Sequence, residues 1–373
     1  MNRFFFVGYL TIFIAFTLFS YLFVDANFIY LPFPLKGFNE QYRILVSGIY
    51  FLLISIFFAV YVLLLKNINS VIQNLNEIKK FIPVFLIPIF AYSAMLSYDI
   101  FNYIATARVL FYYRENPYLV MPIEFLRDPI LLFTHAANKL ALYGIFWVFI
   151  SAVPYFLSFG NYIISIVAFK IFIAIFYFGL VFLIWKLTKN KLSVLLFAAN
   201  PLVIIETFIS GHNDIVMMFF ALLAVYLLRN KRIFLGVFCL FLSILIKYAT
   251  LFLLPIFLFT IIQTLKNKKI DWNKFYLLSF FSIFVVFILS FLREEIYPWY
   301  AIWPLTFLVL IPQKDKLINI LLGLTFGLIL SYIPYMYFGT YFGPTPLAKV
   351  VLILFPPILL FAYQIIKKFN RDF

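Results

Sequence analysis

Long apolar stretches alternate with short polar turns along most of this 373-residue chain. A helix of about 20 residues crosses the hydrocarbon core of a membrane, which is about 30 Å thick. Each apolar stretch near that length is therefore a possible membrane-spanning helix, and a span can be shorter where its polar ends are buried. The pattern predicts an all-α polytopic membrane protein with about 12 transmembrane helices. These stretches are 4–24, 42–65, 81–97, 162–185, 192–209, 215–228, 233–246, 249–265, 274–292, 299–311, 317–334 and 347–366.

The segment 98–161 interrupts this alternation. Residues 141–158 are apolar enough to resemble a membrane span. However, Pro154 weakens a straight helix, and counting this stretch as a span would place the next basic loop on the external side of the membrane. We therefore predict one long external loop over 98–161, with amphipathic helices that lie on the outer leaflet or dip into it. The expected helices are 99–113, 123–141 and 145–158. The whole chain, 1–373, is then a single membrane domain, with the remaining transmembrane helices in 162–373.

The composition agrees with a membrane protein and explains the basic charge. Only 12% of residues are charged, against roughly 25% in soluble domains. Its single cysteine, Cys239, excludes a disulfide framework and a thiolate metal cluster. With the N-terminus in the cytoplasm, 19 of the 29 Lys and Arg residues but only 4 of the 14 acids fall in cytoplasmic segments. The net charge of +15 therefore orients the chain, with both termini cytoplasmic, and indicates no nucleic-acid partner.

Ionisable groups are costly inside a membrane, and the few present here gather on the predicted external side. Asp99 lies where the third apolar stretch meets the long loop. Partial desolvation at this boundary is expected to raise its pKa and make the carboxylate a better base. The structural alternative is that Asp99 is an N-cap of the next helix.

A second polar group follows a helix break at Asn200-Pro201, where proline frees a backbone carbonyl. Glu206, His212 and Asp214 are expected to line one outer rim. One His with two carboxylates could bind a divalent metal, but no second His or Asp-x-Asp pair lies nearby, and we predict no metal. The structural alternative is a hydrogen-bonded helix end with Asp214 capping the next helix.

Two basic residues on the same side are candidates for contact with a lipid phosphate. Lys247 lies in an outward turn, where it either neutralises a phosphate or extends toward lipid headgroups. Arg293 precedes Tyr297 and Trp299, aromatics that are typical of a belt at the membrane interface.

These residues resemble a known family when they are taken in chain order. Ser97-Tyr98-Asp99 through Tyr103, with Glu115-Asn116-Pro117-Tyr118, resembles the first-loop signature of GT-C-fold glycosyltransferases. Asn200-Pro201-Leu202, Glu206 and Gly211-His212-Asn213-Asp214 resemble motifs of the prenyl-phosphomannose-dependent mannosyltransferase branch. Lys247-Tyr248 and Tyr297 to Tyr300 also match that branch, so the likeness covers roughly residues 80–305. One departure is Ile145, which follows Tyr143-Gly144 where the family often has proline.

The resemblance implies a glycosyltransferase that moves a sugar, with mannose the family-weighted choice, from a polyprenyl-phosphate donor to an acceptor hydroxyl on the external face, with inversion. Asp99 would be the general base, and Lys247, Arg293 and His212 would bind the donor phosphate. The implied sugar or acceptor contacts are Asn213, Asp214, Glu206, Tyr98, Asn102, Arg108, Asn116, Tyr118, Tyr297 and Trp299. The implied partners are membrane lipid, the lipid-linked donor and a glycan or glycolipid acceptor. We expect no cofactor, and a monomer.

Two other classes of protein stay open at this point. A transporter or flippase of a lipid-linked sugar would also have many helices with buried charges, although the break at Pro201 has no evident counterpart in the other half. A non-catalytic membrane scaffold would not require Asp99, Lys247, Asp214 and Arg293 to converge.

Overall fold

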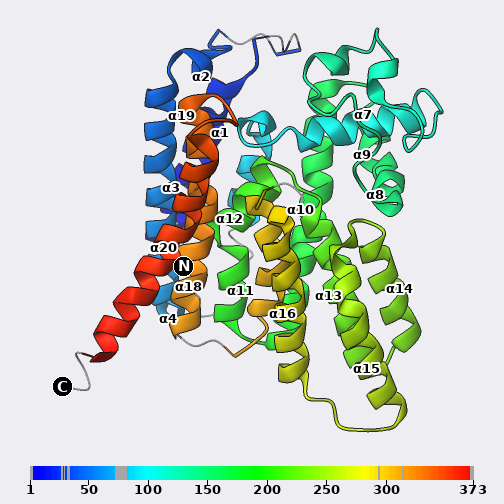
Figure 1. Ribbon diagram of the computed structural model, residues 1–373, viewed down its shortest axis with the longest axis vertical. Coiled ribbons are helices and arrows are strands. Elements are labelled where there is room, and N and C mark those ends of the chain that lie inside the picture. The colour runs from blue at the N-terminus through cyan, green and yellow to red at the C-terminus, as the bar shows by residue number, and fades with distance from the viewer. Residues whose placement is uncertain are drawn as a thin grey trace.

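Helices packed side by side make up the computed structural model, and no strand occurs among its described residues (Figure 1). The described residues are 3–26, 28, 30–31, 34–71, 82–292, 295–312 and 315–369. Seven helical segments in these ranges are long and apolar enough to cross a membrane. They are Arg3–Phe23, Arg43–Lys66, Tyr162–Thr188, Tyr248–Leu265, Trp272–Leu292, Leu317–Phe338 and Thr345–Lys367. The all-helical prediction is confirmed, and these helices are compatible with a multi-pass membrane protein.

The predicted number of about 12 spans is not confirmed in the described part of the chain. The bent pair Lys191–Ala198 and Pro201–Ile209 raises the number of candidate spans to eight at most. Other apolar stretches form short or broken helices. Residues 81–97, for example, contain α6 (Ile82–Leu86), η2 (Ile87–Phe90) and η3 (Ser93–Met95). Hydropathy alone does not separate a crossing from a short helix buried inside the protein, because both are equally apolar.

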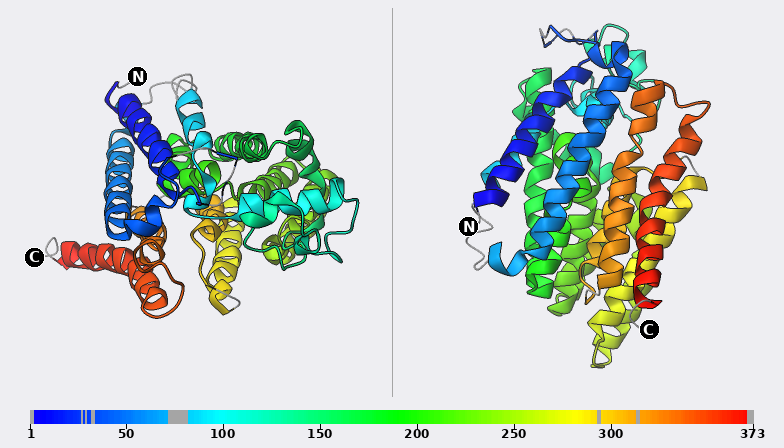
Figure 2. Two further views of the ribbon diagram at one scale, coloured as in Figure 1. Left: turned by 90° about the horizontal axis from the view of Figure 1, so that it is seen from above. Right: turned by 90° about the vertical axis from the view of Figure 1, so that its left-hand side faces the viewer.

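Two groups of helices enclose a central layer (Figures 1 and 2). One group holds α1 (Arg3–Ser20), α3 (Arg43–Lys66), α18 (Asp315–Leu330), α19 (Ile333–Phe338) and α20 (Thr345–Phe369). The other holds α10 (Tyr162–Thr188), α13 (Asp214–Arg229), α14 (Ile233–Ile244) and α15 (Leu254–Leu265). Between them lie α11 (Lys191–Ala198), α12 (Pro201–Ile204), α16 (Trp272–Leu289) and α17 (Ile302–Leu308).

The centre of the core is one continuous segment, because every residue from 193 to 218 is buried. It includes η6, a π-helical turn over Ile205–Ile209, between α12 and α13. The remaining short elements connect the larger helices at their ends. They are η1 (Tyr21–Phe23), α2 (Phe38–Gln41), α4 (Ile68–Val71), η7 (Tyr248–Leu253), η8 (Ser290–Leu292) and η9 (Pro298–Ala301).

The segment 98–161 covers one end of the bundle, which we call the α7 end (Figure 1). The predicted first helix is confirmed as α7 (Asp99–Phe111). The predicted helix 145–158 is present as two shorter helices, α8 (Ile145–Ile150) and α9 (Ala152–Leu157). The break agrees with Pro154, which has no N–H to donate to the carbonyl of Ile150.

The predicted helix 123–141 is wrong, since this stretch contains only the turns η4 (Pro122–Glu124) and η5 (Pro129–Leu132) and irregular chain. Proline begins both turns, and the residue before a proline is disfavoured in helical conformation. Asp128 reinforces the second turn by accepting a hydrogen bond from the Ile130 N–H at 3.1 Å.

Asp128 also anchors the segment to the bundle. Its carboxylate contacts Arg108 Nε at 2.7 Å and accepts hydrogen bonds from the hydroxyls of Tyr113 and Tyr162, each at 2.9 Å. Burial raises the pKa of Asp128, but Arg108 and these hydrogen bonds lower it below the usual value. Arg108 is therefore committed to a structural ion pair, with only 12% of its side chain exposed.

We expect Asp128→Asn to destabilise the protein by about 3 kcal/mol, because it leaves the largely buried Arg108 charge without its counter-ion. Unfolding of the purified protein in detergent by denaturant measures this change. Glu124→Gln is the matched control, since Glu124 is exposed in the same segment, and we expect a loss of at most about 1 kcal/mol. Equal stability of the two variants would show that Asp128 is not the anchor.

Candidate functional site

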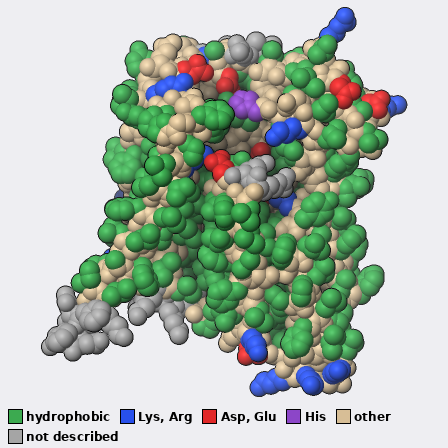
Figure 3. Space-filling model, viewed as in Figure 1, with side chains coloured by type: hydrophobic (Ala, Val, Ile, Leu, Met, Phe, Trp, Pro, Cys, Tyr) green, Lys and Arg blue, Asp and Glu red, His purple; other side chains and the backbone are tan. Residues whose placement is uncertain are grey.

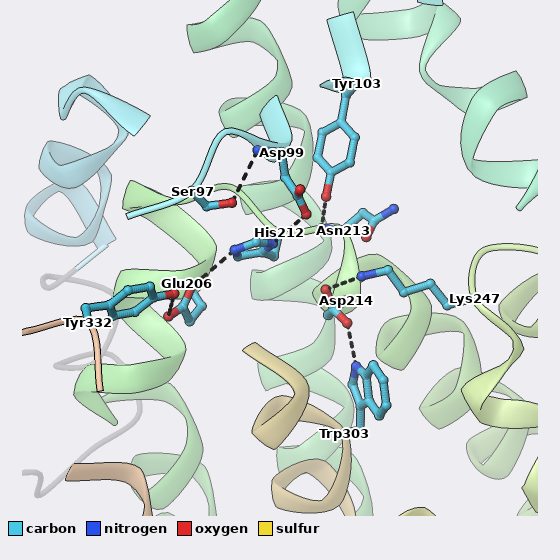
Figure 4. A network of polar contacts seen from close by, with 10 residues as sticks. All are labelled: Ser97, Asp99, Tyr103, Glu206, His212, Asn213, Asp214, Lys247, Trp303 and Tyr332. Atoms are coloured by element: carbon cyan, nitrogen blue, oxygen red, sulfur yellow. Dashed lines mark hydrogen bonds and ion pairs between the residues drawn. The ribbon is translucent and has the colours of Figure 1, made fainter. Parts of the chain in front are cut away.

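Charged side chains gather around a hollow near the α7 end of the protein, whereas Lys and Arg side chains dominate the opposite end (Figure 3). The cluster beside the hollow comes from three separate parts of the chain. Asp99 begins α7, Glu206 and His212 lie before α13, and Lys247 precedes η7 (Figure 4). Three of the motif regions identified in the sequence are therefore brought together.

An irregular backbone positions Glu206 and His212. The Asn200 side chain caps α12 by accepting from the Leu202 N–H at 2.9 Å, and the chain bends by 52° between α11 and the helix that begins at Pro201. The π turn then carries Glu206, and the His212 N–H donates to the Glu206 carbonyl at 2.9 Å. Gly211, between them, has φ of +75°, and a Cβ there would collide with the Ile100 side chain. Only glycine fits this bend.

The result is a fully buried imidazole between two carboxylates. His212 Nδ1 lies 3.2 Å from Asp99 Oδ2, and His212 Nε2 lies 3.3 Å from Glu206 Oε2. Burial lowers the pKa of His212, but the contacts with Asp99 and Glu206 raise it to about 9. His212 lies in the turn 210–213, outside the candidate spans. The ring is therefore cationic at neutral pH.

The electrostatic expectation for Asp99 is corrected by this contact. Burial does raise the pKa of Asp99, as expected, but His212 and the more distant Lys247 together lower it below the usual value. Asp99 is therefore ionised at neutral pH. Its side chain is 22% exposed, whereas Glu206 and Asp214 are fully buried, so Asp99 is the carboxylate of this cluster that solvent reaches.

A second ion pair lies beside the first. Lys247 Nζ is 2.7 Å from Asp214 Oδ2, and the Trp303 indole N–H donates to the other oxygen of Asp214. Asp214 is buried, and 18% of the Lys247 side chain remains exposed. The lysine charge is thus held at the hollow by an acid that solvent does not reach.

The long 98–161 segment holds Lys247 in place through the backbone. The Gly144 N–H donates to the Ile246 carbonyl and the Phe146 N–H to the Leu245 carbonyl, both at 3.0 Å. A Cβ on Gly144 would collide with the Leu245 carbonyl, so a side chain at this position would disrupt the pairing. Gly144 therefore has a structural role, although the next residue, Ile145, departs from the family pattern.

Asn213 lies between the two ion pairs and has unused hydrogen-bonding capacity. Its backbone N–H donates to the Tyr103 hydroxyl at 3.1 Å. Its side-chain amide is buried, yet neither the oxygen nor the nitrogen has a hydrogen-bond partner among the described residues. Buried amides without partners are rare in proteins, and this one lies beside the two ion pairs, where a ligand's hydroxyl groups could pair with it (Figure 4).

Two of the predicted aromatic residues, Trp299 and Tyr297, lie against the cluster. The Trp299 ring stacks on His212 with centroids 3.9 Å apart, and Tyr297 stacks on Trp299 at 4.4 Å. Tyr98 donates its hydroxyl to Asp25 at 2.8 Å while His135 stacks on its ring. Arg293, the second predicted phosphate contact, lies outside the described residues.

Three other predicted contacts make internal bonds within the 98–161 segment. Asn102 Oδ1 accepts from the Ala136 N–H at 3.3 Å. Asn116 Oδ1 accepts from the Tyr118 N–H at 3.0 Å, and the Tyr118 hydroxyl donates to the Tyr143 carbonyl at 2.8 Å. With Arg108, these residues organise the segment that holds Asp99 and Lys247.

Two residues that complete the cluster, Trp303 and Tyr332, are not among the predicted contacts. Trp303 follows the Tyr297–Tyr300 motif inside an apolar stretch, and Tyr332 lies in an apolar stretch with no motif around it. The Tyr332 hydroxyl donates to Glu206 Oε1 at 2.9 Å. No group of three or more His, Cys, Asp or Glu side chains within the described ranges is arranged to hold a metal ion.

The sequence of this chain matches the model of one protein family over residues 6–263, more than half of its length. That family is described as alpha-(1→6)-mannopyranosyltransferase, N-terminal domain. No curated protein and no solved structure matches the chain.

The buried His212 cation makes stability depend on pH in a defined direction. Its folded pKa of about 9 exceeds the unfolded value of about 6.5, so its contribution is complete below pH 6.5 and is lost as the pH rises through 9. We expect wild type to lose a few kcal/mol over this window relative to His212→Gln, since one pKa unit corresponds to about 1.4 kcal/mol. Unfolding free energies in detergent between pH 6 and 10 measure the difference, and a constant difference would contradict a buried cation.

Proposed function

Because the chain belongs to the alpha-(1→6)-mannopyranosyltransferase family, and is therefore a glycosyltransferase, we propose that it transfers mannose from a polyprenyl-phosphate donor to an acceptor hydroxyl. The observation that carries this proposal is the ionised and partly exposed Asp99, with the Lys247 cation and the unpartnered Asn213 amide close by (Figure 4). The family name further suggests a sugar 6-hydroxyl as the acceptor.

Asp99 is the general base in this mechanism. The acceptor hydroxyl attacks the anomeric carbon of mannose, a new C–O bond forms, and the C–O bond to the lipid phosphate breaks. The acceptor proton passes to Asp99, and the bonding electrons leave with the phosphate. Attack opposite the leaving group inverts the configuration, so an α-linked product requires a β-linked donor. A hydroxyl becomes strongly acidic as it bonds to carbon, so an ionised, oriented carboxylate suffices despite a low pKa.

Lys247 is the cation that receives the leaving phosphate, whose charge grows as the bond breaks. Fixed cations that stabilise developing charge are among the most effective catalytic devices. Because Asp214 and the backbone of 245–246 hold Lys247 in place, little reorganisation is needed when the charge develops. Arg293, close in sequence to Trp299, is proposed as a second phosphate contact.

Asn213 is proposed to bind the transferred sugar. Its amide can donate to one sugar hydroxyl and accept from another, which satisfies a polar group that is otherwise buried and unpaired. Asp214 lies beside it but is already engaged by Lys247 and Trp303. It therefore contributes by holding Lys247 more than by reaching the sugar.

The reaction is proposed to occur at the external face, with the α7 end outward. The basic loop between α15 and α16, which contains Lys266, Lys268 and Lys269, lies at the opposite end (Figures 1 and 3). Loops rich in Lys and Arg favour the cytoplasmic side. Membrane lipid surrounds the helices, the donor enters from the bilayer, and a glycan or glycolipid acceptor reaches Asp99 from the aqueous side.

We expect Asp99→Asn to lower kcat by 10²- to 10⁴-fold, roughly what a positioned base contributes, with little change in donor binding. Transfer of radiolabelled mannose from a prenyl-phosphate donor to a short mannoside measures the effect. Asp271→Asn is the control, because Asp271 caps α16 at the opposite end and asparagine caps equally well. Near-wild-type transfer by Asp99→Asn would refute the assignment of the base.

We expect Lys247→Gln to weaken inhibition by free polyprenyl phosphate about 10- to 100-fold, the scale of a charge-assisted hydrogen bond of about 1.5–3 kcal/mol. Inhibition by the corresponding polyprenyl alcohol should not change, because it has no phosphate. Lys139→Gln removes an exposed lysine of the same region as a control. Equal weakening with phosphate and alcohol would indicate general damage to the site instead.

A further inference from the structure

Glu206 occupies a position that does not fit a contact with sugar. Its side chain is fully buried in the π turn η6. One carboxylate oxygen accepts the Tyr332 hydroxyl at 2.9 Å, and the other lies 3.3 Å from His212 Nε2. Both oxygens lie against protein side chains and the residue is closed to solvent, so a contact with sugar does not account for this buried acid.

The contacts of His212 explain this acid. A neutral imidazole donates through one nitrogen only and presents a lone pair at the other. A lone pair facing either Asp99 or Glu206 as a carboxylate would be repulsive. The doubly protonated ring is instead attracted to both carboxylates, which lie 3.2 and 3.3 Å from its nitrogens as ion pairs. It also reduces the total charge of Asp99, His212 and Glu206 from −2 to −1. Such neutralisation matters because an uncompensated buried charge is strongly destabilising.

We propose that Glu206 is a positioning residue that acts through His212: it holds the imidazole as a cation against Asp99 and thereby fixes the orientation and ionisation of the catalytic carboxylate. This inference rests on the proposed function, in which Asp99 is the general base. It gives Glu206 a role one contact removed from the reacting atoms.

The surroundings of His212 favour Glu206 as the residue responsible. Among the residues that the structure describes, the titratable or charged groups around the ring are Asp99 on α7, Glu206 on η6, Lys170 on α10 against the Gly211 turn, Asp214 on α13, Lys247 before η7 and Tyr332 between α18 and α19. Among these, only Asp99 and Glu206 contact the ring nitrogens as acids. Asp99 gives up its charge when it accepts the acceptor's proton, whereas Glu206 keeps its charge. Glu206 can therefore hold the cation through the whole reaction.

Trp299 closes the remaining side of the ring. It stacks on His212 with an interplanar angle of 17°, a geometry in which an aromatic face stabilises a cation. Tyr332 fixes the far oxygen of Glu206. Asp99, His212, Glu206 and Tyr332 thus form one chain of contacts that leads from the hollow into the core (Figure 4).

The first test is the pH dependence of kcat for wild type and Glu206→Gln. Glutamine keeps the shape but removes the charge, so His212 should lose its proton at lower pH. In wild type, we expect kcat to fall with rising pH near pH 9. In Glu206→Gln this fall should occur about one to three pH units lower, while KM for the donor changes little. Tyr332→Phe is the matched control, since it removes a contact of Glu206 but leaves the charge, and the fall in its kcat should shift much less. A purely structural role would lower activity equally at every pH and would overturn the proposal.

The second test does not depend on activity. Protonated imidazole quenches the fluorescence of an adjacent indole, so Trp299 should report the protonation of His212. We expect a fluorescence rise with a midpoint near pH 9 in wild type and at lower pH in Glu206→Gln. His212→Gln and Trp299→Phe should both abolish the rise, which separates Trp299 from the four other tryptophans of the chain. An unchanged midpoint in Glu206→Gln would overturn the proposal even if that variant were inactive.

The two proposals can fail separately. If Asp99→Asn remains active, the assignment of the general base falls, whatever the fluorescence shows. If Asp99→Asn is inactive, and Glu206→Gln keeps the wild-type pH dependence of kcat and the wild-type fluorescence midpoint, only the proposed role of Glu206 is refuted.

Discussion

The site depends on one buried imidazole held between two carboxylates. His212 contacts Asp99 from the start of α7 and Glu206 from the π turn of the core. Without the positive ring, two acids would lie on either side of a neutral imidazole in a space largely closed to water, and buried charge without a counter-ion is strongly destabilising. The ion pair therefore does more than stabilise the site. This group of contacts joins the segment that covers the α7 end to the buried centre of the bundle. It also fixes the position of the Asp99 carboxylate.

This arrangement requires backbone that is not regular helix. A continuous helix through 200–214 would separate Glu206 and His212 by six residues, which places them on different faces. The π turn inserts an extra residue and Gly211 adopts a left-handed conformation. Together they bring Glu206 against one nitrogen of His212 and leave the other nitrogen facing Asp99 (Figure 4). Irregular helical turns of this kind often mark functional sites. The unpaired amide of Asn213 lies at the same place, so the departures from ordinary packing coincide with the hollow.

The sequence predicted the members of the cluster better than their contacts. Asp99, Glu206, His212, Asp214 and Lys247 all lie at ends of apolar stretches on one side, so their proximity followed from topology. Which acid would pair with which base did not follow, because pairing depends on the π turn and on Gly211. Trp303 and Tyr332 were missed since an aromatic residue in an apolar stretch has no distinguishing pattern. The helix predicted over 123–141 failed because Asp128 and two prolines impose turns that outweigh its apolar content.

The contacts from the end of the chain bear on how the site is built. The match to the mannosyltransferase family ends at residue 263, yet Trp299, Trp303 and Tyr332 come from beyond it. Each touches a different member of the cluster: Trp299 stacks on His212, Trp303 binds Asp214, and Tyr332 binds Glu206. Asp99, Lys247 and Asn213 lie within the matched region, together with the charged residues that pair with Asp99 and Lys247. The two parts of the chain therefore form one site, in which aromatic side chains of the later segment pack against or bind charged groups that the earlier segment supplies.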